Sequence, residues 1–170
     1  MIIQEMTLEE CHTELTRAKF GRLACSRANQ PYIVPIRFVF DQGDVYSFSM
    51  LGQKVEWMRA NPLVCLQVDR VTGADDWTSV LVFGRYDELQ EPDDHTERRR
   101  AHELLQRTVM WWQPGSTRVS NRNGDGDADP IFFRIIVSKL TGHRGVPDAR
   151  AGSLPLARNL SRARSSQTSR

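Results

Sequence analysis

Apolar residues along this chain recur mostly in short runs, a pattern that is typical of β-strands. The run from Pro31 to Phe40 is rich in β-branched and aromatic residues, and it predicts a buried strand. The turn residues Asp41-Gln42-Gly43-Asp44 separate this run from a second strand, Val45 to Met50. Four further runs predict strands of the same kind: Phe20 to Arg27, Leu63 to Val68, Trp77 to Leu89 and Ile131 to Leu140.

The sequence also predicts three helices. Thr7 and Glu10 fit a capping box, with Thr7 as the N-cap. Asn61-Pro62 ends a short amphipathic segment that begins after Gly52. The three predicted helices are Leu8 to about Lys19, Gln53 to Arg59, and roughly Asp94 to Met110. Strands that follow one another over short turns favour an antiparallel sheet, and six of them favour closure into a barrel. The predicted fold class is mainly β with flanking helices (α+β).

Composition narrows the class of protein. The 170 residues are 39% hydrophobic and 26% charged, which is typical of one soluble globular domain. No apolar run reaches the roughly 20 residues of a membrane helix, and the N-terminus lacks a signal-peptide pattern, so we expect a cytoplasmic protein without a membrane partner.

The net charge of +2 is unevenly distributed. Residues 146–170 hold five arginines and one aspartate, so that segment carries +4 and the remainder −2. A mildly acidic body does not indicate a nucleic-acid-binding domain. We therefore predict a folded domain, residues 1–146, and a disordered basic tail, residues 147–170.

The cysteines and histidines predict no metal site. Cys11, Cys25 and Cys65 form no CxxC pair, and Cys25 and Cys65 lie in apolar runs where small core residues are expected. The histidines of the predicted helices are not at metal-ligand spacing, and no catalytic triad is recognisable. Catalytic residues stay unassigned.

One stretch does predict chemistry. The polar strand end Ser47-Phe48-Ser49 leads into Gly52, a helix start and Lys54. Free backbone N–H groups, the positive end of the helix dipole and an ammonium together suit an anion such as phosphate.

The chain resembles the pyridoxamine 5′-phosphate oxidase-like family, the FMN-binding split barrels, over about Met6 to Arg144. It is most similar to the branch that includes nitroimidazole-resistance proteins. The segments that carry the resemblance are FGRLA (20–24), PYIVP (31–35), VYSFS (45–49), GQK (52–54), Asn61-Pro62, WTSV (77–80) with Gly84, and TGHR (141–144).

This resemblance implies a six-stranded antiparallel split barrel with FMN at a homodimer interface. The exposed aromatics Trp111 and Trp112, and a flavin that one small barrel only half covers, also favour a second subunit. The implied cofactor contacts are Val34, Pro35, Ile36 and Arg37 along the ring edge, Trp77 and Ser79 on the neighbouring strand, Ser47, Phe48 and Ser49 along the ribityl chain and phosphate, and Gln53 and Lys54 at the phosphate.

The implied activity is that of an FMN-dependent oxidoreductase on an unidentified small molecule, with a reduced nicotinamide or oxygen as partner. Gln53 stands where the family has an arginine, which should weaken phosphate binding. The nitroimidazole-resistance branch usually has a histidine in the strand of Ser47-Phe48-Ser49. The alternative function is a non-catalytic module that stores or senses a flavin or haem, and a deazaflavin is an alternative cofactor.

Two alternatives about particular side chains stay open. Arg37 is the one charge in an apolar run, so it needs an anionic partner. That partner is either a carboxylate such as Asp69 or Asp76, or the electron-rich edge of a flavin. Trp111 and Trp112, which open the polar stretch Gln113 to Asp129, either stack on a flavin or cover one end of the barrel.

Overall fold

The computed structural model describes residues 1–90, 95–106 and 130–148. In chain order the elements are β1 (Ile2–Glu5), α1 (Leu8–Arg17), β2 (Phe20–Arg27), β3 (Gln30–Arg37), β4 (Val39–Asp41), β5 (Asp44–Ser49), α2 (Gln53–Ala60), β6 (Leu63–Gly73), β7 (Asp76–Glu88), α3 (His95–Gln106) and β8 (Ile131–Val146).

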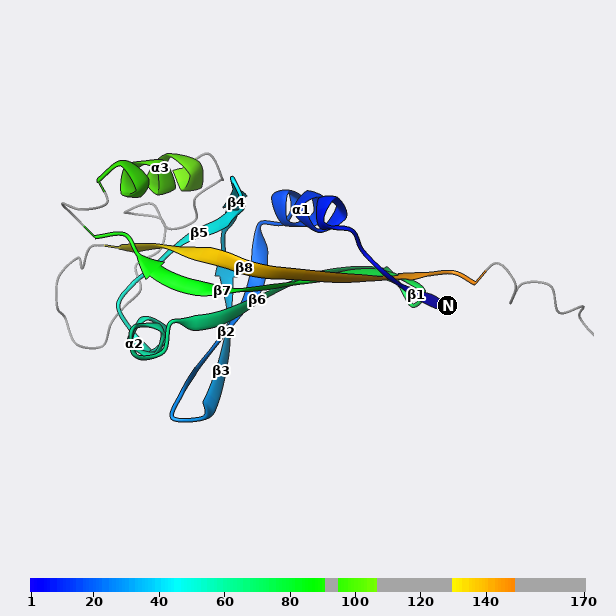
Figure 1. Ribbon diagram of the computed structural model, residues 1–170, viewed down its shortest axis with the longest axis horizontal. Coiled ribbons are helices and arrows are strands. Elements are labelled where there is room, and N and C mark those ends of the chain that lie inside the picture. Colours follow the sequence, from blue (N-terminus) through cyan, green and yellow to red (C-terminus); the bar gives the residue numbers. More distant parts are fainter. Residues whose placement is uncertain (91–94, 107–129, 149–170) are drawn as a thin grey trace, which may run out of the picture.

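The strands form one antiparallel sheet in the order β3-β2-β6-β7-β8-β5-β4. The first half of β8 pairs with β5, and its last residues pair with β1. Strands β6, β7 and β8 therefore continue past the body of the molecule as an arm, with β1 beside them (Figure 1). Helices α1 and α2 contribute side chains to the same core cluster, whereas α3 packs against a second, smaller cluster.

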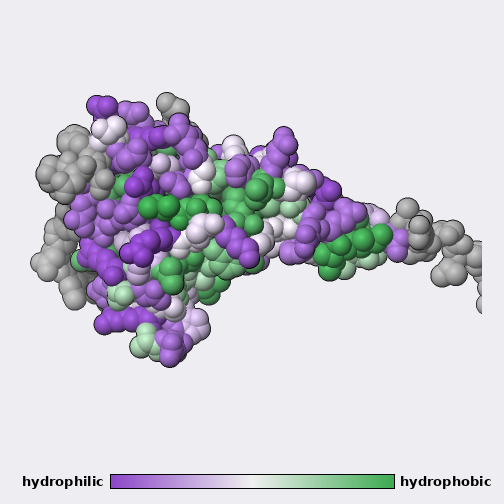
Figure 2. All heavy atoms as spheres, in the orientation of Figure 1, coloured by the Kyte–Doolittle hydropathy of each residue, from purple (hydrophilic) through white to green (hydrophobic). Residues whose placement is uncertain are grey.

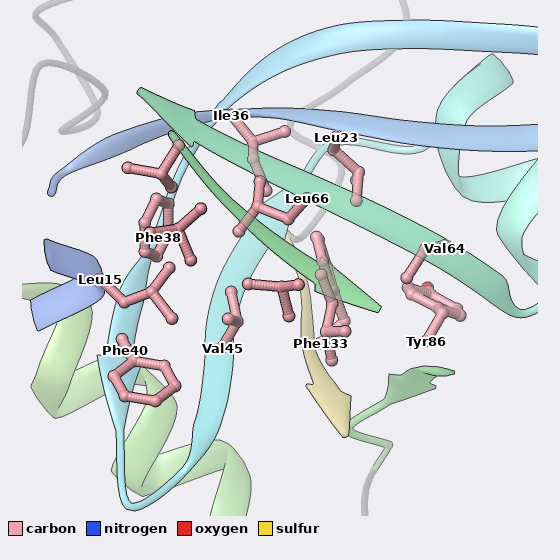
Figure 3. Packing of buried hydrophobic residues seen from close by; sticks show 14 of the residues in the cluster. Leu15, Leu23, Ile36, Phe38, Phe40, Val45, Val64, Leu66, Tyr86 and Phe133 are labelled. Atoms are coloured by element: carbon pink, nitrogen blue, oxygen red, sulfur yellow. The ribbon is translucent and has the colours of Figure 1, made fainter. Parts of the chain in front are cut away.

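A hydrogen bond joins the two parts of the curved sheet where the chain turns from β3 toward β5. The Ser47 hydroxyl donates to the Arg37 carbonyl at 2.6 Å, and Ser47 is fully buried. The core lies inside this curve (Figure 3), where side chains from α1 and from several strands meet. Its members include Leu15, Leu23, Ile36, Phe38, Val45, Leu66 and Phe133.

The sheet curves like a barrel but does not close, because β3 and β4 are the two ends of the strand order. The predicted fold class, a mainly β split barrel with flanking helices, is thus confirmed. The predicted count of six strands is wrong, because the described residues contain eight.

The sequence prediction missed two strands for different reasons. Strand β1 is short, and all four of its residues are exposed, so no alternation of apolar and polar residues reveals it. The run from Pro31 to Phe40 divides at Phe38, whose backbone N–H donates to the Lys19 carbonyl at 3.3 Å. Phe38 thereby separates β3 from β4 while its own side chain is 1% exposed in the core.

The structure agrees with two helix predictions that depend only on neighbouring residues. The capping box forms as expected, with Glu10 N donating to Thr7 Oγ1 at 3.2 Å and Thr7 N donating to Glu10 Oε2 at 2.8 Å. Helix α3 agrees with its prediction over residues 95–106. The rest of that helix, Trp111 and Trp112, the stretch 113–129 and the tail 149–170 lie outside the described residues.

None of the helices in the described part of the chain has the length and apolar content that crossing a membrane requires.

Candidate functional site

The N-terminal end of α2 has polar groups without side-chain partners. Gly52 is its N-cap, and no side chain there accepts a hydrogen bond from the helix. The first backbone N–H groups of a helix have no intrahelical acceptor, so they are available to a ligand. Val55 and Met58 are fully buried and fix the inner face of the helix, while Gln53 is exposed.

Lys54 follows directly on this helix start and is only partly exposed. Burial disfavours its ammonium and lowers the pKa of Lys54 below the ordinary value of 10.5. No carboxylate of the described residues raises the pKa of Lys54 again. The one group among them that does so is the Cys25 thiol, whose own pKa is raised by burial. A partly desolvated cation beside the free N–H groups of a helix start favours the binding of an anion.

Four of the predicted cofactor contacts lie on the outer face of the curved sheet. Strand register pairs Pro35 with Arg22, Arg22 with Gln67 and Gln67 with Leu81. Directly paired residues, and residues two apart on one strand, point to the same face. The shared outer face therefore carries Pro35, Arg37, Trp77 and Ser79. The resemblance implied Val34 to Arg37 together with Trp77 and Ser79 as ring contacts, and the register brings four of these six residues to one face.

Of the other predicted contacts on strands, only Phe48 lies on this face by register, and it does so at β5, where α3 packs on it. Val34 and Ile36 point to the opposite side and pack in or against the core. Ser47 is committed to the Arg37 carbonyl. Phe48 packs toward α3, with its ring 6.1 Å from that of Phe132. Ser49 donates to the Met50 carbonyl at 2.8 Å.

Arg37 stacks on an aromatic ring. Its guanidinium carbon lies 4.7 Å from the centroid of the Phe20 ring, its direct partner across β2 and β3. The two carboxylates considered as partners are used elsewhere: Asp69 accepts from Arg22, and Asp76 accepts from Thr72.

A separate cavity of about 360 Å³ lies between α1 and the arm. Of the predicted residues, it is lined only by Trp77. Within its lining, Arg144 pairs with Glu10 and Arg70 pairs with Glu14. Among the described residues, no group of three or more His, Cys, Asp or Glu side chains is arranged to hold a metal ion.

The sequence did not reveal the residues that fix α2. Arg59 on the helix donates two hydrogen bonds to Glu88 on β7, 29 residues further along. No local signal links the two positions, because each one alone is an ordinary surface charge. Only the fold brings them together.

The strand order and the open, barrel-like sheet with its flanking helices define a split-barrel protein. The family model for pyridoxamine 5′-phosphate oxidase matches residues 7–144, so the chain belongs to this family. It is 40% identical over 143 residues to an uncharacterised protein of Rhizobium meliloti (strain 1021), covering 84% of this chain and 95% of the relative.

Solved structures extend the comparison. An FAD-binding protein from Mesorhizobium loti is 38% identical, with 85% of this chain and 99% of the other covered and a TM-score of 0.70. The haem storage protein HutZ from Vibrio cholerae is 14% identical, with 78% and 89% covered and a TM-score of 0.58. The second likeness concerns the fold alone.

Proposed function

We propose that this protein binds FMN and acts as a flavin-dependent oxidoreductase on a small molecule, with a reduced nicotinamide or oxygen as its partner. The observation that carries the proposal is Lys54, a partly buried ammonium that no carboxylate of the described residues neutralises, on the uncapped start of α2. A phosphate would satisfy both the ammonium and the free N–H groups.

The ring of the flavin would lie against the outer face of the sheet. Pro35, Arg37, Trp77 and Ser79 share that face, whereas Val34 and Ile36 would contribute only backbone groups. A bound flavin supplies the redox chemistry. The chain would hold the phosphate through Lys54, keep water from one side of the ring, and place the positive charge of Arg37 near it.

A second copy of the chain would complete the site. The outer face exposes large apolar side chains that none of the three described helices covers: Phe20 (53% exposed), Ile33 (59%), Leu63 (66%) and Phe83 (38%). Figure 2 shows apolar surface in the middle of the molecule and again on the arm. Exposed apolar area of this kind is typical of protein interfaces. A C2 homodimer would cover this face and give two equivalent sites.

FAD is the second candidate cofactor, because the Mesorhizobium loti protein that is 38% identical is an FAD-binding protein. FAD has the same ring and a first phosphate at the same position. The two candidates would therefore share the Lys54 contact, and they differ only in the adenylate group that FAD carries beyond that phosphate.

Equilibrium titration of the apo-protein with FMN, FAD and riboflavin, together with the visible spectrum and the light-scattering mass, tests the proposal. We expect binding of FMN, a dimeric mass, and oxidation of a reduced nicotinamide by the loaded protein. Binding of haem in place of every flavin would favour a haem module. Flavin binding without turnover would favour a storage or sensing role.

A further inference from the structure

Helix α2 is too short to hold its own orientation. It has eight residues, and isolated helices of that length are marginal in water. Contacts with the rest of the fold must therefore fix where its first turn points.

The strongest polar contact of α2 stands near its C-terminus. Arg59 Nε donates to Glu88 Oε2 at 2.8 Å, and Arg59 Nη2 donates to Glu88 Oε1 at 2.7 Å. This two-bond geometry fixes angle as well as distance. The side chain of Glu88 is 14% exposed, and the pKa of Glu88 is lowered, chiefly by the hydrogen bonds from Arg59.

A third donor holds Glu88 in turn. The Tyr86 hydroxyl donates to Glu88 Oε2 at 2.9 Å, and Tyr86 is buried, as Figure 3 shows beside Val64 and Phe133. The pKa of Tyr86 is raised, first by burial and then by its bond to Glu88, so the hydroxyl stays a donor. The chain of contacts thus runs from the core through Glu88 to the helix.

Lys54 lies five residues before Arg59, about 7.5 Å along a helix axis. Val55 and Met58 fix the inner face of α2, so the freedom that remains is a small tilt, and a tilt about the Arg59 end would displace the Lys54 ammonium and the N–H groups of the helix start together. We infer that Glu88 is a positioning residue: through Arg59 it sets where the start of α2 meets a phosphate. The inference rests on the proposed FMN site.

Glu88→Gln tests it in the full-length protein, with equilibrium titrations of FMN and of riboflavin, which has the ring but no phosphate. Because the bidentate contact is lost, the expected result is a loss of FMN affinity on the order of tenfold, with riboflavin affinity changed by less than about twofold. Tyr86→Phe removes one of the three bonds to the carboxylate and should give a smaller loss of the same selectivity.

Asp87→Asn is the matched control. Asp87 directly precedes Glu88 on β7 and accepts from Arg134 Nε at 2.7 Å, so this variant also loses an ion pair, but one that does not involve α2. Its ratio of FMN to riboflavin affinity should equal that of the wild type.

Equal losses for both ligands in Glu88→Gln, or no loss, would overturn the inference. If Glu88→Gln does not fold, the ratio of FMN to riboflavin affinity in Tyr86→Phe tests the inference in the same way: an unchanged ratio would overturn it. A wild-type protein that does not distinguish FMN from riboflavin would instead refute the phosphate site at Lys54, which is a separate failure.

Discussion

The two ends of α2 differ in how fully their polar groups are satisfied. At the C-terminal end, Arg59 is bonded twice to Glu88, and the Asn61 side chain donates to the Ser26 carbonyl and hydroxyl at 3.2 and 3.1 Å. At the N-terminal end, Gly52 provides no cap, and burial lowers the pKa of Lys54 without a carboxylate from the described residues to offset it.

Under the proposed function, the C-terminal end of α2 has a structural role and the N-terminal end, within the same eight residues, binds the phosphate. Burying a cation without a partner destabilises the folded state. The contacts of Arg59 and Asn61 at the C-terminal end, together with the burial of Val55 and Met58, offset this cost and keep the helix in place. An unsatisfied end on a well-anchored element is the arrangement that pre-organises a site for a ligand.

Replacing Lys54 should produce the largest effect on this comparison. Lys54→Ala removes the charged donor, so FMN affinity should fall by about 1.5–3 kcal/mol. Riboflavin affinity should hardly change, because that ligand has no phosphate. Titrations of both ligands measure the difference. Lys19→Ala, an exposed lysine outside the site, is the control. Losses of equal size for both ligands would place the phosphate elsewhere.

Replacing Arg59 should weaken the satisfied end. Arg59→Ala leaves Glu88 without its bidentate partner, and we expect the free energy of unfolding to fall by about 1–2 kcal/mol, discounted because Arg59 is 46% exposed. Urea denaturation measures it. Arg99→Ala breaks an exposed pair with Glu103 at 3.9 Å and should cost less than about 0.5 kcal/mol. Similar losses for both variants would remove the special role of the Glu88 contact.

The sequence predicted where α2 begins, because the residues that mark the helix start stand within a few positions of one another. Gly52, Lys54 and the helix from Gln53 stand together in the chain, and the observed helix ends one residue later than predicted. The turn Asp41-Gln42-Gly43-Asp44 was equally local, and Gln42 and Gly43 have the positive φ that such turns favour.

Features that depend on distant pairing could not be predicted in this way. The Arg59–Glu88 contact joins residues 29 positions apart. Similarly, only the register of β3, β2, β6 and β7 shows that Pro35 and Ser79 face the same side while Ile36 faces the core. The resemblance to a family supplied the list of candidate contacts, and strand register divided the strand residues on that list between two faces.

Gln53→Arg should sharpen the contrast between the two ends by adding a cation to the unsatisfied one. Gln53 is exposed and next to Lys54, so an arginine there has room to reach a bound phosphate. FMN affinity should increase by about 1 kcal/mol, with no gain for riboflavin. Gln30→Arg, exposed at the start of β3, controls for a general effect of charge. An equal gain in both variants would mean nonspecific attraction.

The smallest expected effect is a pH dependence that belongs to Lys54 itself. The pKa of Lys54 is lower in the folded protein than its ordinary value of 10.5, so between these two values the unfolded chain binds more protons. Stability contributed by this position must then rise with pH in that window. Lys54→Met removes the titration, so the stability of the wild type relative to Lys54→Met should increase from pH 8 to pH 10 (roughly the upper part of the lysine range). Saturating FMN should cancel the trend, because a bound phosphate favours the ammonium and raises the pKa of Lys54. Paired urea denaturation of both proteins, with and without FMN, isolates this one group from every other titration they share. A difference that stays constant with pH in the apo-proteins would mean that Lys54 is fully solvated, and the unsatisfied end of α2 would then lose its cation.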